Sequence, residues 1–260
     1  RLSKRDTERK IGFSKRAFLG RVGANLEFLG VIELIPYAAV LAVTVLLVAF
    51  QTHMSGAILV MVGGAAVLFV SGINLFLFIA MGGAAFGFLA VMALNTGYMT
   101  RKLTIWLDPW SDPQGKGFQA IQSMLAIGSG GLTGVGLGNS RQKFNYLPEP
   151  ENDFIFSVLV EELGFIGGAV VLILFALLIL RGYWLALHAR DKFGMLIVVG
   201  ITTLLAAQVI LNVGVVTNLF PNTGISLPFF SYGGTALVIQ LAEMGIVLSV
   251  SRQIPAPKKD

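Results

Sequence analysis

Six long apolar runs constrain the fold of this chain more than any other feature. A helix that crosses a bilayer needs about 20 apolar residues, and each run approaches that length, the first two being the shortest. Charged residues make up 13% of the chain, whereas about 25% is typical of soluble domains. The sequence therefore predicts an all-α, polytopic membrane helix bundle with about six transmembrane helices, near residues 33–50, 55–70, 75–94, 163–187, 195–219 and 232–250.

The basic residues predict how these helices cross the membrane. Residues 1–30 hold eight of the 19 Lys and Arg, as in a cytoplasmic loop or an interfacial helix on anionic lipid. Together with residues 181–192 and 252–260 this side carries 14 Lys and Arg, which leaves five for residues 95–162. The positive-inside rule then places both ends in the cytoplasm and the 95–162 segment outside. The net charge of +5 is explained by a membrane surface, so no nucleic-acid partner is expected.

The segment between the third and fourth apolar runs holds most of the side chains that could carry chemistry. Within it, Phe118, Ile121 and Leu125 recur at helical spacing and predict a half-buried or interfacial helix. The chain contains no cysteine, and no cluster of His or carboxylates has a spacing that specifies a metal site. Residues 127–168 combine many glycines with two cations and five carboxylates: Arg141, Lys143, Glu149, Glu151, Asp153, Glu161 and Glu162.

Two stretches carry a resemblance to a known family. The first is RKLTIWLDPWSDPQGKGFQAIQSMLAIGSGGLTGVGLGNSRQKFNYLPEPENDFIFSVLVEELGFIGG, and the second is PNTGISLPFFSYGGTA at residues 221–236. The first resembles the large extracytoplasmic loop of the SEDS proteins, the group containing FtsW, RodA and SpoVE, and the second resembles the segment that enters that family's last helix. The glycine content and the motif QKFNYLPE are closer to FtsW and SpoVE than to RodA.

The resemblance implies a fold and an activity. The family has about ten transmembrane helices, so roughly four would precede Arg1. Its members are peptidoglycan glycosyltransferases of the bacterial cytoplasmic membrane. They polymerise the lipid-linked disaccharide-pentapeptide lipid II at the outer face, paired with a class B penicillin-binding protein, for division, cell shape or sporulation.

The resemblance also implies a catalytic residue. Asp153 matches the essential aspartate of the family's DFIF motif and would act as the base for the acceptor hydroxyl. From the residues alone, Asp153 directly before the apolar run 154–156 could equally be a helix N-cap. On a continuous helix Glu161 would lie about 12 Å further along the axis, so we expect an orienting or packing role at the interface rather than a close acid partner. The residues assigned to substrate binding are Arg101, Lys143, Glu149, Asn152, Glu161 and Ser231.

A departing diphosphate needs positive charge. Arg101 and Lys143 match basic positions of the family loop, whereas Lys116 and Arg141 read more simply as solvated charges. The glycine run 130–138 could present backbone N–H groups to phosphate, but tight turns explain it equally well. No cofactor is specified by the sequence, and a divalent cation (Mg²⁺ or Mn²⁺) stays an open alternative.

The chain departs from the family pattern at two places. Glu151 and Asn152 stand where the family often has His-Thr, and a carboxylate close to Asp153 could raise the pKa of Asp153. His53 stands in place of an acidic residue in the family's QPDLG motif, which puts any role of that acid in doubt.

Two other functions compete with polymerisation. A lipid II flippase would need polar groups at mid-membrane depth, for which Gln208, Asn212, Gln240 and Glu243 are the candidates. Helix–helix hydrogen bonding explains these four residues equally well. The third function is a non-catalytic scaffold that activates a partner synthase.

Overall fold

The computed structural model describes residues 31–51, 54–95, 98–142 and 152–254, and all regular secondary structure in these ranges is helical. The elements are α2 (Val31–Phe50), α3 (Met54–Val70), α4 (Leu75–Asn95), α5 (Tyr98–Leu107), η2 (Pro109–Ser111), α6 (Phe118–Gly130), α7 (Ile155–Leu187), α8 (Lys192–Val216) and α9 (Gly234–Ser251). The predicted all-α helix bundle is confirmed.

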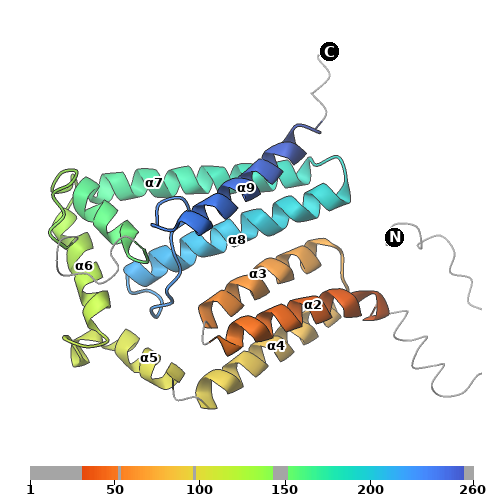
Figure 1. Ribbon diagram of the computed structural model, residues 1–260, viewed down its shortest axis with the longest axis horizontal. Helices are drawn as coiled ribbons and strands as arrows, with labels where there is room; N and C mark the ends of the chain where they lie inside the picture. The colour runs from red at the N-terminus through yellow and green to blue at the C-terminus, as the bar shows by residue number, and fades with distance from the viewer. Residues whose placement is uncertain (1–30, 52–53, 96–97, 143–151, 255–260) are drawn as a thin grey trace, which may run out of the picture.

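The long helices form two groups (Figure 1). α7, α8 and α9 lie together in one group and α2, α3 and α4 in the other, while α5, η2 and α6 connect the two at one end. Contact between the groups runs mainly through α3 and α8. This contact depends on a small residue, because a Cβ on Gly63 would lie 2.7 Å from Cδ2 of Leu204 in α8. The adjacent Gly64 faces Leu41 of α2, as small residues do where membrane helices pack closely.

Helices α7, α8 and α9 are long and apolar enough to cross a membrane, and the described parts of α2, α3 and α4 add three shorter apolar helices. The outer surfaces of these helices are apolar, since large apolar side chains such as Phe76 and Leu180 are more than 60% exposed. A soluble protein rarely exposes so much contiguous apolar surface. Such faces are suited to contact with lipid or with further helices.

The helix bounds differ from the predicted spans mainly at α7. Helices α2, α3 and α4 begin and end within two residues of the predicted limits, whereas α7 begins at Ile155 instead of near residue 163. Residue Gly164 explains the difference, because its backbone (φ 71°, ψ −175°) is not helical and divides α7 into a short leading helix and the long span. The start near residue 163 that the sequence predicted for this membrane span therefore coincides with the break at Gly164.

The segment 95–162 is more regular than a loop, since it contains α5, η2, α6 and the leading part of α7. The helix expected around Phe118 and Ile121 is α6, and its buried face is the predicted one at Ile121, which is 4% exposed, but not at Leu125. Leu125 is 47% exposed, whereas Ser123 is fully buried. The Ser123 hydroxyl lies 2.6 Å from the hydroxyl of Ser157 and donates to the Val216 carbonyl at 2.7 Å. Polar contacts to α7 and α8 thus add Ser123 to a buried face of α6 that also contains the apolar Ile121 and Ala126.

The break at Gly164 generates a test of the fold. Gly164→Ala should lower the free energy of unfolding by about 1–3 kcal/mol or more, because this φ, ψ region is essentially restricted to glycine. A Cβ would also meet the backbone of Leu132 and Gly134. Thermal melting of the full-length protein in detergent measures the effect. Gly128→Ala is the control, since a Cβ in that α6 position meets nothing within 4 Å; equal melting of the two variants would contradict the account.

Candidate active site

Asp153 lies at the start of α7, at the end of the bundle where α6 packs against α7 (Figure 1). Phe154, not Asp153, occupies the N-cap position of α7, and the Phe154 side chain makes no capping hydrogen bond. Phe154 is itself buried, in the apolar cluster with Phe156, Val158 and Leu227. The N-cap alternative for Asp153 is therefore wrong: burial of Phe154 fixes the helix start one residue later and leaves the Asp153 carboxylate outside the helix.

Two side chains from distant parts of the sequence hold the backbone of Asn152 and Asp153. Asn212 of α8, which is 1% exposed, donates from Nδ2 to the carbonyl of Asp153 at 2.8 Å and to the carbonyl of Ile225 at 2.8 Å. The hydroxyl of Ser231 donates to the carbonyl of Asn152 at 2.6 Å and accepts from the N–H of Leu227 at 2.7 Å. The structure thus brings together Asn152, Asp153 and Ser231, which the sequence assigned to the site, and adds Asn212.

The segment 217–233, which connects α8 to α9, forms the wall opposite Asp153. A Cβ on Gly224 would lie 3.5 Å from Oδ2 of Asp153, so the carboxylate faces the backbone at that glycine. Gly224 has φ 70°, a conformation that favours glycine. Its N–H donates to Oδ1 of Asn222 at 3.2 Å. Any larger residue here would be strained and would narrow the space beside the carboxylate.

Helices α5 and α6 support the same segment from its other side. Nζ of Lys102 donates to the carbonyl of Asn222 at 2.9 Å, and Nδ2 of Asn222 donates to Oε1 of Gln119 at 2.8 Å. Nε1 of Trp106 donates to the carbonyl of Asn218 at 3.0 Å. The Asp153 carboxylate and the Lys102 ammonium group therefore both lie beside one short stretch, residues 222–224. A base for a hydroxyl proton and a cation for a phosphate are the groups that transfer from a diphosphate needs.

Lys102 and Asn222 were not singled out by sequence reasoning. Lys102 directly follows Arg101, which matches the family's basic position, and Asn222 lies inside the second resembling stretch. The adjacent basic pair was a usable signal for Lys102. Nothing local to Asn222 predicted its contacts, because they join residues more than 100 positions apart.

Glu161 lies away from Asp153, at the other end of the leading helix, and is 1% exposed. Its carboxylate accepts from Oγ of Ser129 at 3.3 Å and Oγ of Ser140 at 2.5 Å, and from the N–H groups of Arg141 and Gln142 at 3.1 and 3.4 Å. With four donors from the 129–142 stretch, Glu161 organises that stretch. This matches the expected orienting role; substrate contact through Glu161 stays a prediction.

The remaining assigned residues fall partly outside the described structure. Lys143 and Glu149 lie outside the described residues, as do Glu151 and His53. Arg101 belongs to α5, but its side chain is not among those described. Their roles stay predictions.

The glycine run and the two solvated charges have plain structural explanations. Lys116 and Arg141 are exposed. The N–H of Gly134 donates to the carbonyl of Gly130, and that of Gly136 to the carbonyl of Glu162. Gly131, Gly134, Gly136 and Gly138 all have positive φ. The tight-turn explanation of this run is therefore favoured over a phosphate-binding loop.

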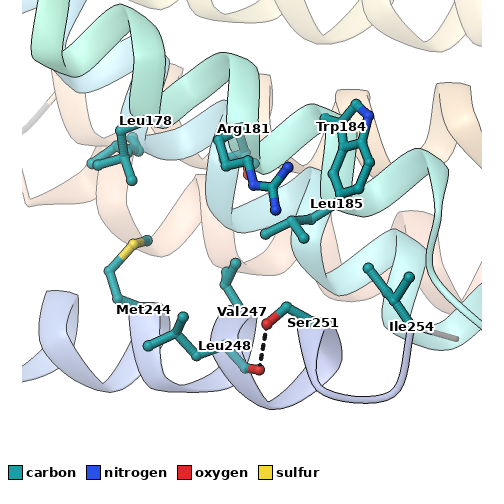
Figure 2. Close-up of a pocket in the computed structure, with 12 residues that line it drawn as sticks. Leu178, Arg181, Trp184, Leu185, Met244, Val247, Leu248, Ser251 and Ile254 are labelled. Atoms are coloured by element: carbon teal, nitrogen blue, oxygen red, sulfur yellow. Dashed lines mark hydrogen bonds between the residues drawn. The ribbon is translucent and has the colours of Figure 1, made fainter. Parts of the chain in front are cut away.

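Among the described residues, no group of three or more His, Asp or Glu side chains could hold a metal ion. Those residues do not fit a protein-held cation, and a divalent cation stays a prediction. A cavity lies between α7, α8 and α9 (Figure 2). On α7 it is lined by residues between Leu178 and Leu185, which lie far along the helix from Asp153. It is separate from the candidate active site.

The helices and the site define a polytopic membrane protein with a carboxylate-containing site at one end of the bundle. The family described as "Cell cycle protein", FtsW/RodA/SpoVE, matches residues 17–255. The chain belongs to this family, as the sequence resemblance implied.

Similarity to individual proteins supports the same family. The chain is 50% identical over 194 residues to stage V sporulation protein E of Bacillus subtilis (strain 168), covering 74% of this chain and 53% of the relative. It is 45% identical over 222 residues to a probable peptidoglycan glycosyltransferase FtsW of Geobacter sulfurreducens, covering 85% and 59%. The chain thus spans somewhat more than half the length of these relatives.

Solved structures show the same fold. A chain from work on structural coordination of polymerization and crosslinking by a peptidoglycan synthase complex matches with a TM-score of 0.66 and 34% identity, over 85% of this chain and 62% of that one. The rod shape determining protein RodA of Thermus thermophilus matches with a TM-score of 0.56 and 30% identity, over 86% and 57%.

The contacts of Glu161 generate a test of the site's scaffold. Glu161→Gln replaces one acceptor oxygen by an NH₂ group, so in either orientation a donor now faces a backbone N–H. Loss of such a bond costs about 1–3 kcal/mol, and amide exchange at Arg141 and Gln142 should accelerate roughly tenfold or more. Hydrogen–deuterium exchange of the full-length protein measures this.

Glu162→Gln is the matched control, since Oε1 of Glu162 is buried with no hydrogen-bond partner among the described residues. Its backbone bond to Gly136 is unaffected by the substitution. If both variants exchange alike at residues 141 and 142, Glu161 does not organise the stretch.

Proposed function

We propose that this chain is part of a peptidoglycan glycosyltransferase that polymerises lipid II into glycan strands, with Asp153 as the base. The observation that carries the proposal is the placement of Asp153. Its backbone is held by Asn212, and its carboxylate faces Gly224 beside the stretch bound by Lys102. The names of the FtsW relatives and of the peptidoglycan synthase complex support the same activity.

The reaction assigns a task to each group. The acceptor sugar hydroxyl attacks the anomeric carbon of the lipid-linked donor, a C–O bond forms, and the bond to the undecaprenyl diphosphate breaks. Asp153 takes the hydroxyl proton. The diphosphate leaves with the bonding electron pair, and Lys102 is close enough to the 222–224 stretch to offset the developing negative charge. Arg101 and Lys143 stay candidates for the same task, and no step is assigned to a metal ion.

The proposed orientation follows from the charges. The cytoplasmic side carries the Arg181–Lys192 turn and the tail, and Asp153 is at the opposite end of α7. The site then faces the outer surface of the cytoplasmic membrane, where a class B penicillin-binding protein could act on the new glycan strand. The described polar groups at mid-membrane depth favour this enzyme over a flippase. Of the four candidates for a flippase path, Asn212 and Gln240 are used in hydrogen bonds to backbone groups, which leaves Gln208 and Glu243 for a translocation path.

The experiment compares wild type with Asp153→Asn in the full-length parent, purified with its partner synthase and supplied with labelled lipid II. Wild type should form glycan chains, and the variant should lose at least two orders of magnitude in rate, the usual contribution of a general base. The control is Asp108→Asn, because Asp108 is exposed and its described hydrogen bonds are through its backbone.

The outcomes separate the three functions. Equal polymerisation by wild type and Asp153→Asn would remove Asp153 from catalysis. Translocation of lipid II in vesicles without polymerisation would favour the flippase. Polymerisation that depends only on the partner's own active site would favour the scaffold.

A further inference from the structure

A cavity of about 570 Å³ lies between α7, α8 and the end of α9, away from the active site. This volume lies in the range of ligand pockets, roughly 300–1,000 Å³. Among the residues that line the cavity, Gly182 of α7 lies close to Thr202 of α8, since a Cβ on Gly182 would lie 2.5 Å from Oγ1 of Thr202. None of the lining residues is acidic, and most are apolar, including Leu178, Leu185, Leu205, Met244, Val247 and Leu248.

One cation enters this apolar cavity. Figure 2 shows the guanidinium of Arg181 directed from α7 towards α9, beside Leu185. Its Cζ lies 4.1 Å from the centroid of the Trp184 ring, a stacking contact that orients the guanidinium. The Arg181 side chain is exposed, so its N–H groups stay accessible from outside the protein. Its N–H groups are thus positioned for an anion.

The position of Arg181 along α7 places it near the inner membrane surface. It follows Phe165, the first residue beyond the Gly164 break, by about 24 Å at a rise of ~1.5 Å per residue, in a hydrocarbon layer about 30 Å thick. The same end of the bundle carries further cations. The start of α8, at Lys192, lies against the end of α9, before Arg252, because a Cβ on Gly194 would be 3.2 Å from Val250.

We propose that this cavity binds one anionic phospholipid of the inner leaflet. The phosphate accepts hydrogen bonds from Arg181, and an acyl chain lies along the apolar walls formed by Leu178, Leu205 and Met244. Basic pockets between membrane helices on the cytoplasmic side are suited to anionic headgroups. An apolar helix from another protein would instead leave the guanidinium without an acceptor. The inference uses the membrane orientation proposed above, but it does not depend on the polymerase activity.

Native mass spectrometry of the full-length protein in detergent tests the site. The protein is incubated with phosphatidylglycerol or with phosphatidylethanolamine, and the lipid that remains bound is counted. Wild type should retain one phosphatidylglycerol in preference to phosphatidylethanolamine. Arg181→Gln should lower this preference roughly fivefold, the contribution of one cation at an anionic surface.

Two further variants make the result specific. Arg190→Gln removes an exposed cation that does not line the cavity, and it should keep the preference. Leu248→Trp adds volume at a lining residue that is 61% exposed, so it should reduce retention of both lipids without disturbing the core.

Three results would overturn the proposal: no lipid retained by wild type, an equal loss of preference in Arg181→Gln and Arg190→Gln, or unchanged retention in Leu248→Trp. The first would indicate that protein fills the cavity, and the second that only diffuse surface charge attracts lipid. Because lipid binding is read directly, none of these results bears on whether the protein polymerises lipid II.

Discussion

The two hydrogen bonds donated by Asn212 are the interaction on which the site depends. A single buried amide joins α8 to the residue that precedes α7 and to the segment that leads into α9. Without it, the carbonyls of Asp153 and Ile225 would be left without this donor where little water reaches them, at about 1–3 kcal/mol each. Ser231 repeats the arrangement one residue earlier, at Asn152. The Asp153 carboxylate is thereby presented by a rigid backbone rather than by a free loop.

The break at Gly164 explains how the same sequence region can serve both the membrane and the site. The leading part of α7 belongs with α6 and the glycine turns, because Glu161 binds residues 129–142 through its carboxylate and Val135 through its carbonyl. Beyond Gly164 the helix is a membrane span. If the helix were straight through residue 164, Glu161 would lie at a different position relative to residues 129–142. A glycine that adopts a non-helical backbone thus divides the scaffold of the site from a transmembrane helix.

Much of the fold could be predicted because apolar length is a local property. The six apolar runs correspond to the six long helices, and close packing at Gly63-Gly64 followed from small residues. The pair Gly82-Gly83 is equally small and by the same argument favours close packing, but a Cβ on either residue meets no neighbour within 4 Å in the described structure. The buried face of α6 was predicted only in part: Ile121 is buried as expected, but Leu125 is exposed and Ser123 is inside, where its hydroxyl finds partners on α7 and α8. Those partners are set by tertiary contacts that periodicity does not encode.

The candidate site was predicted in part. Asp153, Asn152 and Ser231 came from motif resemblance, and the structure brings them together with Asn212, which the sequence suggested only as part of a flippase path or a helix–helix contact. Lys102 was missed although it adjoins Arg101, because its partner Asn222 is 120 residues away in sequence. Motifs therefore supplied the candidate carboxylate, whereas the residues that hold and surround it required the fold.

The most direct test of this account is the turnover of lipid II, at saturating substrate, by Asn212→Ala in the full-length protein with its partner synthase. Gln208→Ala, four residues earlier on α8, is the control. If Asn212 positions Asp153, kcat should fall at least tenfold with little change in KM in a variant that still melts cooperatively, and Ser231→Ala should shift kcat in the same direction. Wild-type turnover by a folded Asn212→Ala protein would contradict the claim that this amide holds the catalytic carboxylate in place.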